Sequence, residues 1–536
     1  MRNRRWVAAG FLAAVCAVGM GRGAARGESH FLTFAGGPAA ESDQASLEQN
    51  VFYFRRTVET LGLRKVGHEE FFADAGKSQH AVEVHVVRTP AEQVSDDIAA
   101  VLNPDTERDV RFRAAAIPGL SGPSTEEALA HWFDTTGKAL PAHAHLLFYF
   151  TGHGGTVDVA PAGRGGGGMG GMNMGGFGGG FGGFRGRGRR AAPVQDPRNT
   201  TMLLWNSPDF TVKDFEKQLD KLDPTVDVTL LMVECHSGGF ANTLYTDADP
   251  KNGLVKRARC GFFASTADRL AAGCTADIDR EDYEEFSTGF FAALSGITRD
   301  GKRIEKPDYD HDGVTSLADA FAYVVLTSNT IDTPMTTSDQ FLRDNSEIPD
   351  TGEGELLGRN PPYAEVLAAA DAFHKAMLEG LSKTLGLTGD NRVIRARALV
   401  EKINNDRVTI ERQQGQLQRQ FDQARGRLRD QVAARWPELG IPLHPDTEKI
   451  LTEEGPAIEK FLQGRPAWRI YTDLSKQLDA LGTRDDALER QGVKAFRFVY
   501  QAESVILAHN LEAGGDEQAK AFYAGLLARE NRPLGG

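Results

Sequence analysis

The sequence has few cysteines and, after its first residues, no long hydrophobic run. A short apolar segment at residues 6–20 follows the positive pair Arg4 and Arg5, a pattern typical of a signal peptide. We therefore expect residues 1–27 to be a signal peptide and the protein to be exported, to the periplasm or outside the cell. No later segment approaches about 20 uninterrupted apolar residues, the length that a membrane-spanning helix needs. We expect no stable membrane insertion once the signal peptide is removed.

An excess of basic residues is also missing. The net charge is −13, with the acidic residues spread along the chain, which argues against nucleic acid as a partner. Of the four cysteines, Cys16 lies in the predicted signal peptide, which leaves Cys235, Cys260 and Cys274. An odd number in an exported protein leaves at least one thiol free or paired between chains. Cys260 and Cys274 could form a disulfide, and two separate thiols are equally compatible with the sequence.

The composition is that of a folded protein with more than one domain. With 40% hydrophobic and 25% charged residues, the chain can bury a sizeable core, and 536 residues suggest two or three domains. Residues 28–345 alternate apolar runs with helical stretches, which predicts an α/β domain with a mainly parallel sheet. The expected strands are residues 30–35, 82–87, 145–150, 226–233 and 261–264, and the expected helices are 47–63, 126–133, 215–222, 283–294 and 318–326.

Two further segments differ in composition. Residues 163–190 are mostly glycine and cannot bury enough apolar surface to fold, so they are interpreted as a flexible insertion. Residues 346–536 are rich in Ala, Leu, Glu, Gln and Arg, and Ile403, Ile410 and Leu417 recur every seven residues. That spacing predicts a short coiled-coil-like helix, followed by helices near 446–463, 466–481 and 494–512. We expect an all-helical C-terminal domain and, where the protein self-associates, association through these helices.

A histidine and a cysteine each follow an apolar strand segment. His153 lies in Thr-Gly-His-Gly after residues 145–150, and Cys235 lies in Glu-Cys-His-Ser-Gly after residues 226–233. Sites form at the carboxyl ends of parallel strands, and a histidine beside a cysteine can activate the thiol as a nucleophile. The N–H groups of Gly154 and Cys235 would then stabilise the oxyanion. Either residue alone is more often structural; the combination favours catalysis.

These motifs resemble those of a known group of peptidases. Tyr-Phe-Thr-Gly-His-Gly at residues 149–154 and Cys-His-Ser-Gly at 235–238 are similar to metacaspase signatures, and residues 262–269, 273–274 and 286–294 resemble bacterial members of the legumain family. Both families belong to the caspase-like clan. The resemblance covers roughly residues 30–345 and implies a caspase-like α/β/α sandwich, a dyad of His153 and Cys235 with Gly154 in the oxyanion hole, and hydrolysis after one preferred residue. Metacaspases carry an Asp two residues before the cysteine, where this chain has Val233, so a preference for Arg or Lys is not implied.

An acidic loop at residues 308–319 has the spacing of a calcium-binding loop. Oxygen-bearing side chains at its positions 1, 3, 5, 9 and 12, with Gly313 at position 6, match what a Ca²⁺ cage needs. The five predicted ligands are Asp308, Asp310, Asp312, Ser316 and Asp319. The alternative is a solvated acidic turn.

The sequence therefore predicts an exported cysteine endopeptidase that acts on protein or peptide substrates, with Ca²⁺ in a structural or activating role and no organic cofactor. Two alternatives stay open. A peptide ligase or transpeptidase of the same fold would resolve the acyl-enzyme with an amine instead of water. A non-enzymatic protein would use the caspase-like scaffold for calcium-dependent binding or assembly in the cell envelope.

Overall fold

The structure is a computed structural model that describes residues 28–103, 109–157, 196, 200–273, 284–442 and 444–535. The predicted signal peptide, the glycine-rich insertion at residues 163–190 and Cys274 lie outside the described residues. Within the described part of the chain, no helix combines the length and the apolar character that a membrane crossing needs.

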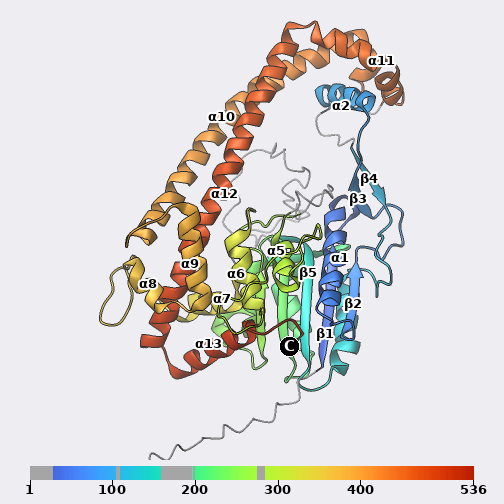
Figure 1. Cartoon of the computed structure of the whole chain (residues 1–536). Coiled ribbons are helices and arrows are strands. Elements are labelled where there is room, and N and C mark those ends of the chain that lie inside the picture. The colour runs from blue at the N-terminus through green and yellow to red at the C-terminus, as the bar shows by residue number, and fades with distance from the viewer. Residues whose placement is uncertain are drawn as a thin grey trace, which may run out of the picture.

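A mainly parallel sheet lies at the centre of the α/β part (Figure 1). Its strands are β1 (Ser29–Gly36), β2 (Gly67–Phe72), β5 (His145–Thr156), β6 (Thr200–Leu204), β7 (Ser207–Thr211), β8 (Asp227–Val233), β9 (Arg259–Phe263) and β10 (Met335–Thr336). The order is β10-β9-β8-β5-β1-β2, parallel throughout except for β10, while β6 and β7 form an antiparallel extension from the end of β5. The α/β class with a mainly parallel sheet is therefore confirmed.

Helices cover both faces of this sheet. Along β5, Leu147 and Tyr149 pack into one hydrophobic cluster and Leu146, Phe148 and Phe150 into another, because successive side chains of a strand point to opposite faces. The helices and short turns of this part are α1 (Ala45–Thr60), α3 (Glu126–Trp132), α4 (Val212–Leu219), α5 (Phe286–Ser295), α6 (Leu317–Thr327), α7 (Thr337–Asn345), η1 (Ala40–Ser42), η2 (Phe133–Gly137), η4 (Ser237–Leu244), η5 (Thr246–Ala248) and η6 (Pro250–Asn252). The first cluster contains side chains of α1, α5 and α6, and the second contains side chains of α3 and α4. Burial on both faces explains why the strands are near-continuous apolar runs.

The sheet differs from the sequence-based expectation in several places, and β6, β7 and β10 are among the strands that were not predicted. β5 continues past Phe150 to Thr156, because its last residues pair with β6. The edge strand β2 was not predicted, because its Gly-His-Glu-Glu start hides the strand pattern. The segment at residues 82–87 forms β3 (Val82–His85), which pairs with β4 (Val110–Arg113) in a separate two-stranded ladder instead of joining the central sheet.

In the described residues after 345, all regular structure is helical, as predicted. It comprises α8 (Tyr363–Ala369), α9 (Ala372–Leu385), α10 (Arg392–Arg435), η7 (Pro437–Gly440), α11 (Thr447–Gln463), α12 (Pro466–Gly514) and α13 (Glu517–Glu530). The heptad residues Ile403 and Ile410 lie on α10 and are buried. The two helices expected at 466–481 and 494–512 are one helix of 49 residues, α12, because the polar stretch between them packs along α10.

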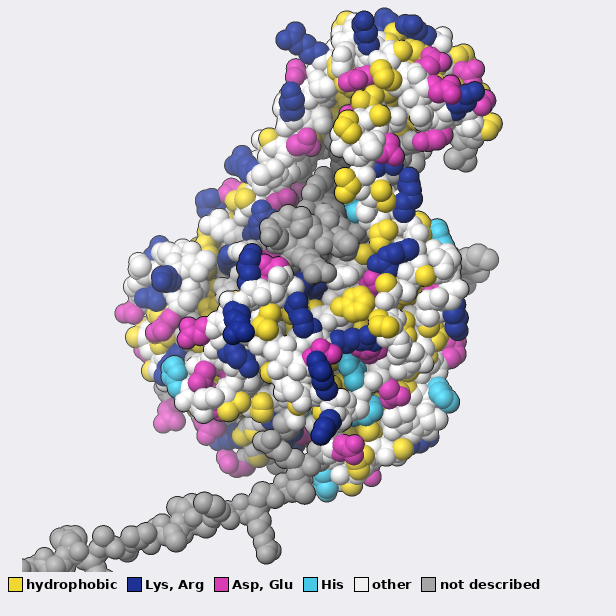
Figure 2. Space-filling model, turned by 45° about the vertical axis from the view of Figure 1, so that its right-hand side comes forward, with side chains coloured by type: hydrophobic (Ala, Val, Ile, Leu, Met, Phe, Trp, Pro, Cys, Tyr) yellow, Lys and Arg dark blue, Asp and Glu magenta, His cyan; other side chains and the backbone are white. Residues whose placement is uncertain are grey.

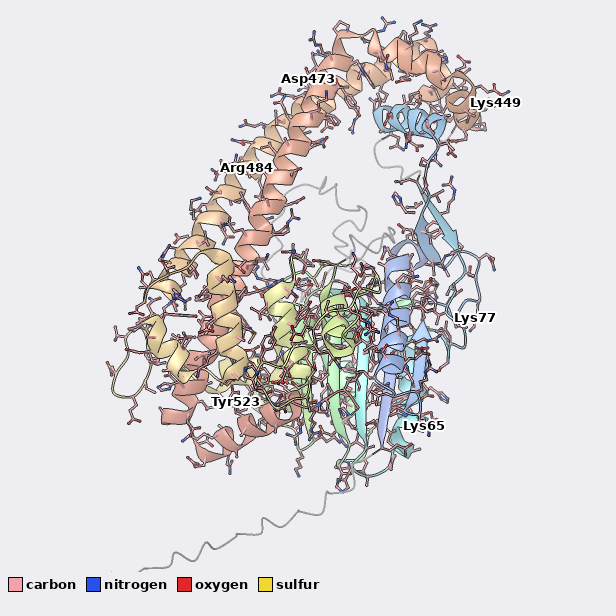
Figure 3. The ribbon with its side chains drawn as sticks, viewed as in Figure 1. Lys65, Lys77, Lys449, Asp473, Arg484 and Tyr523 are labelled. Carbon is pink, nitrogen blue, oxygen red and sulfur yellow. The ribbon has the colours of Figure 1, made fainter. Side chains whose placement is uncertain are left out.

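α10, η7, α11 and the first half of α12 form a helical arm that stands off the α/β part (Figures 1 and 2). In Figure 3, Lys449 marks the tip of this arm, Arg484 lies along it, and Tyr523 lies on α13 near the sheet. The second half of α12 returns to the α/β part, where Phe498 shares a hydrophobic cluster with Phe290 of α5. The domain boundary expected near residue 345 stays a prediction.

Candidate active site

His153 and Cys235 lie at the same end of the sheet, His153 within β5 and Cys235 just after the neighbouring strand β8. β5 and β8 are parallel, with Thr151 opposite Val233. Two residues further along each strand direction bring the chain to His153 and to Cys235. The expectation that both residues follow adjacent strand ends thus describes the observed arrangement, except that His153 is itself within β5, opposite Leu203 of β6.

The backbone of Gly154 lies directly against the backbone of Cys235. A Cβ atom at Gly154 would overlap the Cys235 carbonyl oxygen and lie 2.7 Å from Cγ of Glu234. Only glycine therefore permits this approach of the two strand ends.

Two residues after β1 orient the imidazole of His153. The side chain is 1% exposed, and its Nε2 lies 2.7 Å from the carbonyl oxygen of Ser42 and 2.9 Å from Oε1 of Gln44. Because a backbone carbonyl can only accept a hydrogen bond, Nε2 carries the proton in the neutral ring. Nδ1 is then the nitrogen that can accept a proton.

Burial keeps both members of the pair uncharged. Desolvation lowers the pKa of His153 to about 4, against the hydrogen bond to the Ser42 carbonyl, which raises it. Desolvation raises the pKa of the Cys235 thiol to about 11, the hydrogen bond from the Ala271 backbone lowers it, and the nearby carboxyl groups of Asp332 and Glu234 raise it further. At neutral pH the resting site therefore holds a thiol and a neutral imidazole, so a reaction at sulfur requires transfer of the thiol proton to the base.

The residues after Cys235 fasten it to the loop that follows β9, residues 264–273. His236 adopts a left-handed conformation with φ 62°, and its backbone N–H donates to the carbonyl of Arg269 at 2.8 Å. Ser237 Oγ donates to the Ser265 carbonyl and accepts from the Ser265 N–H. A Cβ at Gly238 would lie 2.8 Å from the Ser265 carbonyl oxygen. The Cys-His-Ser-Gly motif is therefore explained by a sharp turn that is hydrogen-bonded to this loop.

The same loop contacts the sulfur atom. The N–H of Ala271 donates to Cys235 Sγ at 3.3 Å. The next N–H, that of Ala272, donates at 2.7 Å to Oδ1 of Asp332, whose side chain is fully buried. Burial raises the pKa of Asp332 to about 7.

Sequence reasoning missed Ser42, Gln44 and Asp332 as neighbours of the dyad. They come from loops distant in sequence, and no motif marks them. Glu234 carried a signal, since it directly precedes the cysteine. Its carboxyl group is buried, neither oxygen has a hydrogen-bond partner among the described residues, and burial raises its pKa well above the usual range.

Of the other two cysteines, Cys260 is buried within β9, and its thiol lies 3.4 Å from Thr229 Oγ1. Burial raises its pKa to about 12. Because Cys274 lies outside the described residues, the pairing of Cys260 with Cys274 stays a prediction.

The acidic loop brings three of its five predicted ligands together. One carboxylate oxygen each from Asp308, Asp310 and Asp312 lie within 4.8 Å of one another. Ser316 and Asp319 instead form a reciprocal capping box at the start of α6. Three convergent carboxylates suit a hard cation such as Ca²⁺, while the other two predicted ligands are engaged in the helix cap.

This acidic loop lies near the amino-terminal end of β8, whereas the dyad lies at the carboxyl end of the same strand. Asn531 donates to Asp310 Oδ2 at 3.0 Å, and the adjacent Arg532 forms an ion pair with Asp227, the first residue of β8. Cys235 follows the other end of the same strand. A cation held here would be separated from the reacting groups by the length of β8.

Comparison with known proteins identifies no family. No protein-family model matches the chain, and no curated protein matches it. Among solved structures, the chain is similar to the protein GSU0716 from Geobacter sulfurreducens, with 12% sequence identity and a TM-score of 0.24 over 50% of this chain and 80% of that chain.

Proposed function

We propose that this protein is an exported cysteine endopeptidase of the caspase-like clan, in which Cys235 is the nucleophile and His153 is the general base. One observation carries the proposal: the thiol and the imidazole lie at the ends of adjacent parallel strands, and the Ser42 carbonyl fixes the ring proton on Nε2. Nδ1 is thereby left to accept a proton. The helices on both faces of the sheet support the caspase-like α/β/α sandwich that the motifs imply.

The proposed reaction proceeds in two halves. Nδ1 of His153 takes the thiol proton as Sγ attacks the carbonyl carbon of the scissile peptide bond, and the N–H groups of Gly154 and Cys235 bind the oxyanion. The tetrahedral intermediate expels the amine, which receives the proton from Nδ1, and a thioester remains on Cys235. Water then attacks the thioester, His153 accepts a proton from it, and the acid product leaves as the proton returns to sulfur.

Peptide cleavage by matched cysteine variants tests this proposal. We expect Cys235→Ala to abolish cleavage of a peptide library and His153→Ala to lower kcat by about 10²–10⁴-fold, the usual contribution of a general base. Cys260→Ala is the control, because it removes a buried thiol in a strand next to β8. Undiminished cleavage by Cys235→Ala would contradict the assignment.

Two further assays distinguish the peptidase from the two alternatives, a ligase or transpeptidase and a non-enzymatic envelope protein. Adding an amine nucleophile reveals a ligase or transpeptidase, because the acyl group then appears in a new amide and not in the free acid. A thiol-directed affinity probe that leaves Cys235 unlabelled favours the non-enzymatic envelope protein.

We further propose that Asp308, Asp310 and Asp312 hold a Ca²⁺ ion. We assign it a structural role, since the loop is linked through Asn531 and Arg532 to the start of β8, at the far end of this strand from Cys235. A ligand that binds only the folded state stabilises it by about 2.7 kcal/mol at a hundred times its Kd. Adding a chelator should therefore lower the melting temperature of the wild type. The melting temperature of Asp310→Ala should be the same with and without the chelator. Glu305→Ala, which removes an exposed carboxylate just outside the loop, should retain the response. A wild-type melting curve that ignores chelator would contradict the site.

A further inference from the structure

Two parts of the chain that are far apart in sequence meet at the tip of the helical arm. Between β3 and β4 the chain forms α2 (Pro90–Leu102), which projects away from the sheet. Ile98 and Val101 of α2 are buried in one cluster with Leu451 and Ile458 of α11. Ser95 Oγ adds a hydrogen bond of 3.0 Å to the Leu451 carbonyl. The helical arm, α2 and β3 thus form a closed arch, which Figure 1 shows above the α/β part of the chain.

One end of this arch is attached to the residues that orient His153. The N–H of Glu83 on β3 donates to the carbonyl of Asp43 at 2.9 Å, and Glu83 forms a β-bridge with Gln44. The Gln44 side chain is the one that contacts Nε2 of His153. A displacement of β3 would therefore move a hydrogen-bond partner of the imidazole.

The other end of the arch is attached to the loop that contacts Cys235. Arg497 of α12 is 2% exposed, and its guanidinium donates to the backbone carbonyls of Ser328, Thr330 and Asp332 at 2.8–3.1 Å. The Asp332 carboxylate in turn accepts from Ala272, next to the residue that donates to the sulfur.

A second contact from α12 reaches the same loop. The guanidinium of Arg269 lies 3.9 Å from the centre of the Phe496 ring, and the Arg269 carbonyl accepts from His236. Phe496 and Arg497 are consecutive, so one turn of α12 supports the loop on both sides of Ala271. Ala467 of α12 belongs to the apolar cluster at the tip of the arm. It lies 30 residues before Arg497, which is about 45 Å along the helix at 1.5 Å per residue.

We propose that the arch positions the dyad: Gln44 aligns the imidazole of His153 and Asp332 fixes the loop that donates to Cys235 Sγ, each held by one end of the arch. The proposal rests on the peptidase function proposed above. Gln44 and Asp332 are positioning residues, since they act through His153 and through the Ala271–Ala272 backbone. The physical reason for a closed arch is that each segment alone is long and narrow, whereas contact at the tip restricts the motion of both ends together.

Opening the tip tests the coupling without touching the dyad. In the full-length chain, Ile98→Asp buries a carboxylate in the apolar cluster, which opposes its packing. Ile441→Asp is the control, because this side chain lies on the arm close to the tip and is 54% exposed. Hydrogen exchange of the α2 amides reports whether the tip has opened. We expect faster exchange in Ile98→Asp only, with kcat lowered about tenfold or more and KM within about twofold, the pattern of lost alignment.

Alkylation of Cys235 by iodoacetamide gives a readout that does not depend on peptidase activity. A loosened loop exposes the thiol, so we expect its alkylation rate to rise about threefold or more in Ile98→Asp and to stay unchanged in Ile441→Asp. If the wild type cleaves no peptide, the proposed function fails while this rate still decides the coupling. Faster α2 exchange with unchanged alkylation and unchanged kcat overturns the proposal. Unchanged hydrogen exchange of α2 in the double variant Ile98→Asp/Leu451→Asp also overturns the proposal. It would show that the apolar contacts between α2 and α11 do not hold the arch closed.

Asp332 provides an independent test at the other end. Asp332→Asn keeps an oxygen that accepts from Ala272, whereas Asp332→Ala removes it. We expect Asp332→Ala to raise the alkylation rate of Cys235 and lower kcat, and Asp332→Asn to restore both to within about threefold of the wild type. Equal behaviour of the two variants contradicts a positioning role.

Discussion

The neutral resting state of the dyad predicts an unusual pH dependence for the reactivity of Cys235. With a pKa of about 11, roughly one thiol in 10⁴ is ionised at pH 7, against about 3% for an unperturbed cysteine with a pKa of about 8.5. Since the thiolate is the nucleophile, alkylation of folded Cys235 at pH 7 should be about 300-fold slower than in the denatured chain. The rate should rise about tenfold per pH unit from pH 6 to pH 9.5.

Peptide mapping after timed iodoacetamide treatment measures this rate for Cys235 separately from the other cysteines. The denatured protein at each pH supplies the reference, and it should level off near the ordinary thiol pKa. A folded-state rate that is flat between pH 6 and pH 8, or faster than the reference, would refute the reasoning. It would mean that the site rests as a thiolate paired with a charged imidazole, in spite of the desolvation of both groups.

Two further substitutions probe the groups around the dyad. Burial raises the pKa of Glu234 well above the usual value of about 4.3 for a glutamate, so the folded state keeps a proton that the unfolded state releases. The stability that this group contributes therefore falls as pH rises from about 4.3 towards the folded-state pKa, by at most about 1.4 kcal/mol per pH unit. Glu234→Gln should flatten the pH dependence of urea unfolding, and identical slopes for variant and wild type would count against an uncharged, buried Glu234. Gly238→Ala should destabilise the fold and abolish cleavage, because the added Cβ would lie 2.5 Å from Met335 Sδ and 2.8 Å from the Ser265 carbonyl oxygen. As a control, Gly426→Ala on α10 adds a Cβ with nothing within 4 Å and should stabilise the helix by about 1 kcal/mol. Melting curves of both variants test this, and an unchanged melting temperature in Gly238→Ala would contradict the tight turn.

The sequence predicted the parts of the site that follow from local pattern. Apolar runs before His153 and Cys235 marked two buried strands, which is enough to bring both residues to one end of a parallel sheet. Gly238 after Cys235 marked a tight turn, whereas Gly154 lies within β5 and permits the close approach to Cys235. The helices of the arm were likewise visible in their spacing. The division of α12 into two helices was wrong, because its polar middle is stabilised by packing along α10, and that contact has no local signature.

The supporting residues could not be predicted for the same physical reason. Gln44 reaches His153 because a turn after β1 folds back over the sheet edge, and Asp332 reaches the Cys235 loop because Arg497, 165 residues later, holds its backbone. Such partners depend on tertiary contacts between distant segments, and residue type alone does not mark them. The acidic loop shows the converse: its spacing suggested five ligands, while local capping of α6 engages Ser316 and Asp319.

Trapping the acyl-enzyme tests the central claim most directly. An intact peptide that the enzyme is known to cleave is mixed with the enzyme, and the reaction is quenched in acid within its first turnovers. The intact mass of the enzyme and the site of its modification are then determined. The account predicts a mass increase equal to the acyl half of the peptide, located on Cys235 and absent in Cys235→Ala, and hydroxylamine should remove it, as expected for a thioester. Cleavage that continues with no adduct on Cys235, or with the adduct on another residue, would contradict the assignment of Cys235 as nucleophile.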